Sequence, residues 1–384
     1  MDKNTYCASF WNHQMIDTTG RVKPCCRFVE DPGSSFNIMD TDIKEIFYSN
    51  YMQDLRNMSK SGVEIRGCQR CYEEQNNNKK SLRQRINENH ATNMVDLDDP
   101  SINYLELAIS NDCNLMCRIC SSRYSQKLYQ EELEYFGKAH VPSRYTRSNI
   151  DAAYDLLPDL KYIKFTGGEP LIIKEHWELL ECAVSKGYAS SMTLNYSTNC
   201  TIWPKAKHVQ LWKNFKRIEM ALSVDSVVAA ENEYQRHLTD HAAVLKNVRR
   251  YKDLSACLPM LVSCRPTISI YNIYHLPETL EWLHDMDIKV NPTHLTYPQC
   301  LSITVLPPEQ KNVISNKFKN YSYKRPIDRQ LSYYLLDYMH SKDSSDLMPQ
   351  FARYTRYLDQ RRTQDFTKVC WYFGDLLNSF KGDS

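Results

Sequence analysis

Three cysteines in the middle of the chain are spaced closely enough to bind one metal centre together. Cys113, Cys117 and Cys120 are separated by three and then two residues. Three thiolates can hold three irons of a 4Fe-4S cluster and leave the fourth iron without a protein ligand, as a catalytic zinc site keeps one position open. An open iron can bind a substrate or a cofactor. Zinc with a fourth ligand from elsewhere, or three reduced core thiols, would also explain the spacing.

A second set of cysteines lies near the N-terminus. It contains Cys7, then Cys25 with Cys26 beside it, and finally Cys68 and Cys71 in a Cys-x-x-Cys pair. Four thiols can complete a tetrahedral zinc site or a fully ligated 4Fe-4S cluster, and both readings stay open. Either member of the adjacent pair could be the ligand, although the spacing favours Cys25.

The other cysteines show no mutual ligand spacing, and we interpret them as mostly structural. A total of fourteen is high for a cytosolic chain, in which structural disulfides are rare, so the count itself favours metal ligation by some of them. Cys264 and Cys300 lie near predicted strands, where a hydrogen-donor role is conceivable. The six are Cys182, Cys200, Cys257, Cys264, Cys300 and Cys370.

Glycine and short polar residues follow three predicted strands. The segments are 166–170 (Thr-Gly-Gly-Glu-Pro), 197–199 (Ser-Thr-Asn) and 223–225 (Ser-Val-Asp). The carboxyl ends of strands are where barrel enzymes place their chemistry. Paired glycines let the backbone approach a ligand, and short polar side chains can bind hydroxyls or a carboxylate, although they also form ordinary turns. Arg236 can engage both oxygens of a carboxylate, or form a surface ion pair.

Together these motifs resemble those of the radical S-adenosylmethionine superfamily. In that family the three cysteines ligate a 4Fe-4S cluster, and the amino and carboxylate groups of S-adenosylmethionine chelate its open iron. Ile119 departs from the pattern, because many members carry there an aromatic residue that packs on the adenine. The resemblance implies that Gly167, Gly168 and Glu169 contact the methionine amino group, Asn199 and Asp225 the ribose, and Ser223 and Arg236 the carboxylate.

The N-terminal cysteines resemble the auxiliary-cluster module called SPASM in its full form and twitch in its short form. The shared features are Cys7, Gly20 and Cys25 at intervals of twelve and four residues, followed by Cys68-x-x-Cys71. The module usually follows the barrel, so its position here resembles the subgroup with an N-terminal twitch domain. The resemblance implies a second 4Fe-4S cluster on these four cysteines, for electron transfer or positioning.

The elements that position these residues alternate between short apolar strands and amphipathic helices from about residue 102, which is typical of β-α units. The expected strands are 105–109, 162–165, 192–196, 218–222, 267–271 and 288–295, with helices near 177–187, 237–252 and 274–286. We therefore expect an α/β fold with a partial six-stranded TIM-like barrel at 102–305. A small α+β auxiliary-cluster domain at 1–95, a linker at 93–101 and a helical segment at 306–384 flank it.

Composition argues against some classes of protein. A net charge of +2 and a charged fraction of 24% disfavour an extended nucleic-acid footprint or a membrane-surface patch. The sequence has no signal-peptide pattern and no apolar run of membrane-spanning length. A cytoplasmic location is the default expectation.

The resemblance implies an enzyme that uses one electron to cleave S-adenosylmethionine to methionine and a 5'-deoxyadenosyl radical, which abstracts a substrate hydrogen. A flavodoxin or ferredoxin would supply the electron. We expect a peptide or protein substrate, with oxidation of a sugar or an alcohol as the alternative. A non-enzymatic zinc-binding interaction protein would explain the cysteines but not the Gly-Gly-Glu-Pro segment at 167–170. No catalytic acid or base is indicated.

Overall fold

The chain forms two compact units in a computed structural model. Described are residues 5–31, 34–76, 80–88, 95–140 and 147–380. The first unit contains residues 1–112, 143–196 and 204–218, and the second contains 113–142, 197–203 and 219–384. These units differ from the three consecutive segments expected from the sequence. The division into three domains stays a prediction. The first residues of the expected linker, 93 and 94, lie outside the described residues.

The first unit is built on a sheet whose strands run in the order β3-β2-β1-β4-β6-β7. Their bounds are β1 His13–Ile16, β2 Arg21–Lys23, β3 Phe36–Asn37, β4 Tyr104–Ala108, β6 Tyr162–Thr166 and β7 Thr193–Thr198, the last two residues of β7 belonging to the second unit. β1, β4, β6 and β7 pair in parallel, and β2 pairs antiparallel with β1 and β3. The N-terminal segment thus continues the same sheet through β1.

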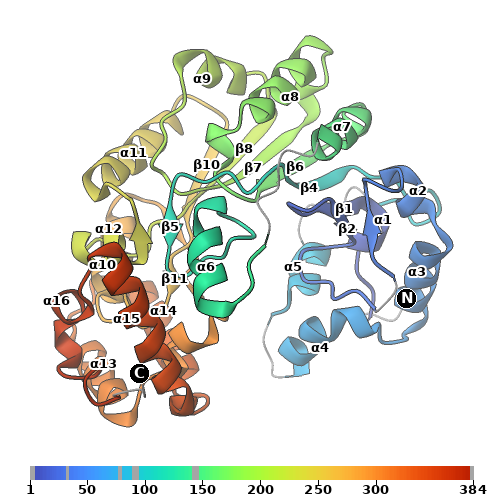
Figure 1. The fold of residues 1–384 in the computed structure, drawn as a ribbon. Coiled ribbons are helices and arrows are strands. Elements are labelled where there is room, and N and C mark those ends of the chain that lie inside the picture. The colour runs from blue at the N-terminus through green and yellow to red at the C-terminus, as the bar shows by residue number, and fades with distance from the viewer. Residues whose placement is uncertain (1–4, 32–33, 77–79, 89–94, 141–146, 381–384) are drawn as a thin grey trace. The chain divides into compact units, whose positions relative to one another are not determined.

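The two faces of this sheet differ in polarity because side chains alternate along a strand. Leu105, Leu107, Ile163 and Phe165 are all fully buried on one face. Figure 1 shows α7, α8 and α9 together on one side of these strands. Their bounds are Arg147–Leu156, Lys174–Ser185 and Ala206–Trp212. The opposite face carries polar side chains and is described with the candidate site.

Short helices complete the N-terminal part of the first unit. They are α1 Ser9–Asn12, α2 Ile43–Tyr48, α3 Asn50–Ser61, α4 Gln69–Asn76 and α5 Leu82–Glu88. The Asp42 side chain caps α2, and the Ser49 hydroxyl caps α3. Gly20 turns the chain between β1 and β2 with a φ of +80°, and a Cβ there would lie 2.6 Å from the side-chain oxygen of Asn37. The turn therefore requires glycine on both counts.

In the second unit β8 (Arg217–Leu222, whose first two residues belong to the first unit), β10 (Met260–Cys264) and β12 (Lys289–Val290) are consecutive in the sheet. Two shorter pairs accompany them. β11 (Thr267–Ile268) lies parallel to β13 (Thr293–His294), and β5 (Met116–Cys117) lies antiparallel to β9 (Arg236–His237). The strand expected at 267–271 is thus only two residues long, and β10 takes its place in the sheet.

The rest of the second unit is mostly helical. Its helices are α6 Tyr129–Phe136, α10 Ala229–Gln235, α11 His241–Leu254, α12 Leu276–Asp285, α13 Pro308–Asn320, α14 Pro326–His340, α15 Met348–Arg362 and α16 Phe366–Val369. The expected mixed α/β class, with parallel strands and a helical C-terminal segment, is confirmed. Across the part of the chain that is described, no helix combines the length and the apolar character needed to cross a membrane.

Candidate cluster and cofactor site

The three-cysteine loop, residues 113–120, lies in the second unit and is held by its own backbone. Cys117 is in β5, opposite Arg236 in β9. The Arg118 amide donates to the carbonyl of Gln235 at 2.8 Å, and the Cys120 amide donates to the carbonyl of Cys117 at 3.1 Å. Cys117 is buried, whereas the other two cysteines are half-buried. A short antiparallel pair and one tight turn thus bring the three thiols to one place.

The thiols of this loop influence one another electrostatically. Burial raises the pKa of Cys117 to about 11, and the charge of Cys113 adds to that shift. Burial also raises the pKa of Cys120, with further contributions from Cys117 and Cys113. Burial thus disfavours the thiolates of Cys117 and Cys120, and a bound metal centre would stabilise them instead. The donor set therefore suits a centre of high positive charge.

Asn199, which follows β7, lies beside the first cysteine. Its Nδ2 is 3.9 Å from Sγ of Cys113 and donates to Oδ1 of Asn114 at 2.9 Å. Thr201 completes a closed set of hydrogen bonds, since its hydroxyl donates to Oδ1 of Asn199 at 2.6 Å and accepts from Nδ2 of Asn114 at 2.7 Å. The amide predicted to lie near the ribose is therefore fixed in orientation next to the cysteine loop.

Asp225 and Arg236 form a buried ion pair. Nη2 of Arg236 donates to Oδ1 of Asp225 at 3.0 Å, and Nε lies 2.7 Å from Oδ2. The carboxylate also accepts from the Thr267 amide at 2.8 Å and from Nε2 of Gln235 at 2.6 Å. These two predicted cofactor contacts thus engage each other. The third, Ser223, is half-buried after β8, and its amide donates to the carbonyl of Thr198.

In the first unit the paired glycines hold the backbone that leads into the three-cysteine loop. A Cβ at Gly167 would lie 2.5 Å from the carbonyl oxygen of Ser110, and one at Gly168 only 1.9 Å from that of Asp112. Asp112 directly precedes the first cysteine and accepts a hydrogen bond from the Glu169 amide at 2.8 Å. Glu169 is buried, and its carboxylate accepts from the Leu171 amide at 3.2 Å. The glycines are thus required for a close backbone approach.

The four N-terminal cysteines predicted as ligands also lie together. Burial raises the pKa of Cys7, and Cys71 adds to the shift. The pKa of Cys25 is raised well above its usual value by burial and then by its neighbours, which include Cys7 and Cys68. The Arg83 guanidinium, which is buried and donates to the carbonyl of Tyr6, opposes part of the shift at Cys7. Among the described residues, no three His, Cys, Asp or Glu side chains stand at the spacing of a single metal ion.

Cys26 has different neighbours from Cys25. Desolvation by the surrounding protein raises the pKa of Cys26. The charge of Glu106 raises it further, and that of Lys164 opposes the shift. Glu106 in β4 and Lys164 in β6 are opposite each other in the sheet and form an ion pair of 2.8 Å. Glu106 is only 4% exposed. The adjacent cysteines thus point to two environments, one among thiols and one on the polar face of the sheet.

Sequence reasoning missed this polar face. Glu106 and Lys164 occupy the alternate positions of strands that were recognised by their apolar residues, so the period-two pattern carried the signal. Tyr104 and Tyr162 extend the same face, with their ring centroids 4.6 Å apart. Also missed was Arg118, whose position between two cysteines was visible but whose partners lie far away in the sequence.

The N-terminal cysteines can now be compared with known proteins. Residues 7–72 match the SPASM family, which is described as an iron-sulfur cluster-binding domain. The N-terminal segment matches SPASM. This confirms the predicted resemblance, and we call residues 7–72 the SPASM segment. The match includes all four cysteines proposed as ligands.

Comparisons of the whole chain are weaker. No curated protein matches it. The structure of anSMEcpe with bound AdoMet is similar at 15% identity and a TM-score of 0.42, covering 62% of each chain. Streptococcus suis SuiB bound to S-adenosylmethionine is similar at 13% identity and a TM-score of 0.40, covering 80% of this chain and 67% of SuiB. The chain thus spans less than two thirds of the length of anSMEcpe.

Proposed function

We propose that this protein is a radical S-adenosylmethionine enzyme with an auxiliary cluster in its SPASM segment. The observation that carries the proposal is the gathering of Cys113, Cys117 and Cys120 in one loop, with Asn199 fixed beside the first of them. The backbone entering this loop is packed against Gly168, at a distance that leaves no room for a side chain. A zinc-binding interaction protein would require no such approach.

The residues of the second unit would hold the cofactors as follows. The three thiolates would ligate three irons of a 4Fe-4S cluster and leave one iron open for S-adenosylmethionine. When bound, this pair supplies one-electron reductive cleavage of the cofactor and a carbon radical that abstracts hydrogen. Asn199, which is held by Asn114 and Thr201, would place its side-chain amide next to the cluster. Asp225 and Arg236 would contact the cofactor as an ion pair. The Arg236 guanidinium would then bind the carboxylate of S-adenosylmethionine while it remains paired with Asp225.

The SPASM segment would hold the second 4Fe-4S cluster with Cys7, Cys25, Cys68 and Cys71. We prefer Cys25 over its neighbour because its thiol lies near those of Cys7 and Cys68, whereas Cys26 lies near Glu106. Four protein ligands would leave this cluster without an open iron, which suits electron transfer. We propose a flavodoxin or ferredoxin as the electron donor and a cytoplasmic location.

The polar sheet face of the first unit is our candidate for substrate contact. A buried ion pair costs more desolvation than it usually returns, so Glu106 and Lys164 are poor choices for stability alone. Tyr104 and Tyr162 add aromatic surface with polar ends on the same strands. This lining fits a polar substrate, and we propose a peptide or protein, with a sugar or alcohol as the second class.

Anaerobic reconstitution with iron and sulfide tests the central proposal. We expect two 4Fe-4S clusters per chain and release of 5'-deoxyadenosine under strong reductant. Replacing Cys113, Cys117 and Cys120 by Ala should abolish cleavage, whereas Cys257→Ala, an exposed cysteine outside both sets, should leave it unchanged. A colourless, zinc-loaded protein that releases no 5'-deoxyadenosine would refute the proposal.

The substrate class can be tested without knowing the substrate. Cells are grown in deuterated medium, and their extract is separated into a peptide fraction and a small-molecule fraction. Each fraction is then incubated with the reconstituted enzyme. We expect deuterium to reach 5'-deoxyadenosine from the peptide fraction. Lys164→Met should reduce this transfer more than Lys161→Met, because Lys161 is an exposed lysine just before the same strand. Transfer only from the small-molecule fraction would favour the second class.

A further inference from the structure

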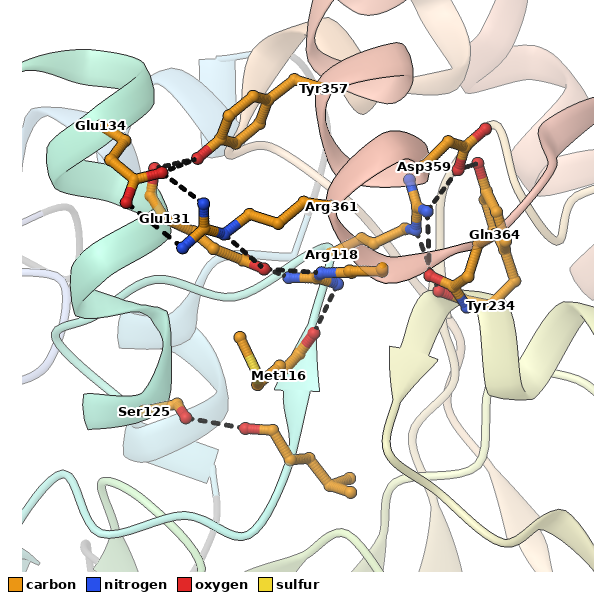
Figure 2. A network of polar contacts seen from close by, with 12 residues as sticks. Met116, Arg118, Ser125, Glu131, Glu134, Tyr234, Tyr357, Asp359, Arg361 and Gln364 are labelled. Carbon is orange, nitrogen blue, oxygen red and sulfur yellow. Dashed lines mark hydrogen bonds and ion pairs between the residues drawn. The ribbon is translucent and has the colours of Figure 1, made fainter.

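Charged side chains of the second unit surround the three-cysteine loop but take no part in the proposed reaction. Figure 2 shows them converging from three places, with Glu131 from α6, Asp359 from α15 and Arg118 from the loop itself. Arg118 lies 241 residues before Asp359 in the chain. The C-terminal helical segment thus reaches back to the loop that would carry the cluster.

Arg118 lies between Cys117 and Cys120 in the sequence, and its side chain is completely buried. Its guanidinium lies 3.7 Å from the centroid of the Tyr234 ring, which favours a cation. Nη2 donates to Oδ1 of Asp359 and, at 2.9 Å, to Oε1 of Gln364. Nε donates to the carbonyl of Tyr234 at 3.1 Å. A permanent positive charge is therefore fixed on a residue of the loop, with Asp359 as its counter-charge.

Asp359 is held for this role by other donors. The Tyr234 hydroxyl donates to Oδ1 at 2.7 Å, and the Phe366 amide donates to Oδ2 at 2.9 Å. These contacts hold the carboxylate in the orientation that faces Arg118. The ion pair is thus fixed from both sides.

Arg362, at the end of α15, binds the loop backbone itself. Nη1 donates to the carbonyl of Met116 at 2.7 Å, one residue before Cys117. Nε and Nη2 donate to the two carboxylate oxygens of Glu131 at 3.1 and 2.5 Å, and both side chains are almost entirely buried. This bidentate geometry leaves the guanidinium little freedom, so the Met116 carbonyl is fixed relative to α6 and α15.

We infer that α15 positions the three-cysteine loop through Arg362, and that the Arg118–Asp359 pair adds to the charge balance of this loop, beside the Arg236–Asp225 pair opposite Cys117, and so contributes to the reduction potential of the cluster. This inference rests on the proposed function. A cluster becomes more negative when it is reduced, so a nearby positive charge raises its potential and a negative charge lowers it. In the buried surroundings of Arg118 neither charge is strongly screened by solvent. The pair is close to neutral, and removing either member uncovers the other.

Potentials of single and double variants test the charge balance. By redox titration of the reconstituted full chain, followed by electron paramagnetic resonance, we expect Asp359→Asn to raise the potential of the cluster in this loop. Arg118→Gln should lower it, and the double variant should return close to the wild type. A purely structural role would not produce shifts of opposite sign. Asp365→Asn is the matched control, because that carboxylate lies on the same segment, accepts hydrogen bonds from Thr367 and pairs at 3.6 Å with the exposed Lys368.

Hydrogen exchange of the cluster-free chain tests the positioning role separately. We expect Arg362→Gln to accelerate exchange of the amides at residues 116–120, because the Met116 carbonyl loses its anchor. Arg361→Gln should change exchange there much less, since its hydrogen bonds are to Glu134 at the surface and its ion pair with Glu131 is longer, at 3.9 Å. Unchanged exchange in Arg362→Gln would overturn the positioning role. Unchanged potentials in both single variants would overturn the charge balance.

Failure of this inference differs from failure of the proposed function. If the wild-type chain binds no cluster at Cys113, Cys117 and Cys120, the proposed function is wrong, and the exchange result still reports on the anchor. If the wild type carries the cluster while the variants behave like their controls, the proposed function stands and only the inference is wrong. If Asp359→Asn does not fold, Arg118→Gln carries the test, because Asp359 keeps its hydrogen bonds from Tyr234 and Phe366 and the potential must then fall.

Discussion

At the scale of the residue, close approach and burial decide which side chains the protein tolerates. Gly168 touches the backbone of Asp112 so closely that no other residue fits without movement. His176 is buried among aromatic rings of the first unit, with its ring centroid 4.6 Å from that of Phe165. Each position combines a local conformation with a contact to a neighbouring element. Each therefore allows a prediction of how a substitution changes the free energy of unfolding.

Replacing Gly168 with Ala should destabilise the first unit by about 3 kcal/mol or more, because the new Cβ overlaps a backbone oxygen that cannot rotate away. Gly187→Ala is the control. It places a Cβ in open space at a positive φ, so its cost should be only about 1 kcal/mol. Urea unfolding of the cluster-free chain measures both, and equal costs would show that contact with Asp112 is unimportant.

The buried imidazole of His176 should make stability depend on pH. Burial, together with the charge of His208, lowers its pKa from 6.5 to about 3, and one ring nitrogen lies 2.8 Å from the Tyr196 hydroxyl. The unfolded chain binds the proton first as pH falls, so this contribution is complete above pH 6.5 and is lost progressively towards pH 3. Between pH 6.5 and 5 the loss of unfolding free energy should amount to about 2 kcal/mol.

A variant isolates that contribution. His176→Phe should flatten the decline of the unfolding free energy between pH 6.5 and 5, measured by urea unfolding of the cluster-free chain. His340→Phe changes an exposed histidine of α14 and should leave the decline as it is in the wild type. An identical decline in all three proteins would contradict the assignment to His176.

At the scale of the element, prolines and capping residues decide where strands and helices end. Pro266 and Pro292 occupy opposite positions of two neighbouring parallel strands, because the register pairs Cys264 with Val290 before them and Thr267 with Thr293 after them. Proline cannot donate to the ladder, so each of these extended segments is divided into two short strands. Pro292 therefore divides the strand expected at 288–295, whereas Pro266 separates β10 from the start of the strand expected at 267–271.

The end of α15 stores strain that a single substitution should relieve. Thr363 follows the helix with a φ of +53°, in a left-handed conformation that is unfavourable for a β-branched residue, and its side chain is exposed. Thr363→Gly should therefore stabilise the second unit by about 1 kcal/mol. Thr363→Ala keeps a Cβ and should gain much less. Denaturant unfolding compares the two, and destabilisation by Gly would contradict the expectation.

At the scale of the whole molecule, each compact unit contains one set of cysteines. The SPASM segment belongs to the first unit, and residues 113–120 belong to the second. Metal binding that requires the folded arrangement of ligands stabilises that arrangement by mass action. The two sets should therefore respond separately to loading.

Reconstitution should slow hydrogen exchange around both cysteine sets. In Cys71→Ser we expect the slowing near residues 7–72 to disappear while that near residues 113–120 persists, because the two ligand sets lie in different units. Cys120→Ser should give the reverse pattern. Cys257→Ser should keep the slowing at both cysteine sets. Loss of both responses from one substitution would show that the two sites do not load independently.

The sequence by itself determined the local features of this protein. Alternating apolar residues predicted β4, β6, β7 and β8 nearly to the residue, since strand periodicity arises from backbone geometry over a few positions. Cysteine spacing likewise identified the SPASM segment, and the glycine pair marked a close approach. These patterns are readable because each depends on neighbours in the chain.

Only the tertiary structure decided which distant residues meet. It joined the SPASM segment to the sheet through β1 and β4, directed Cys25 and Cys26 to different neighbours, and brought Asp359 to Arg118. No local pattern encodes such pairings, because they depend on how strands and helices pack after most of the chain is in place. The chemistry proposed for the loop was thus visible in the sequence, whereas the side chains that would position and tune it were not.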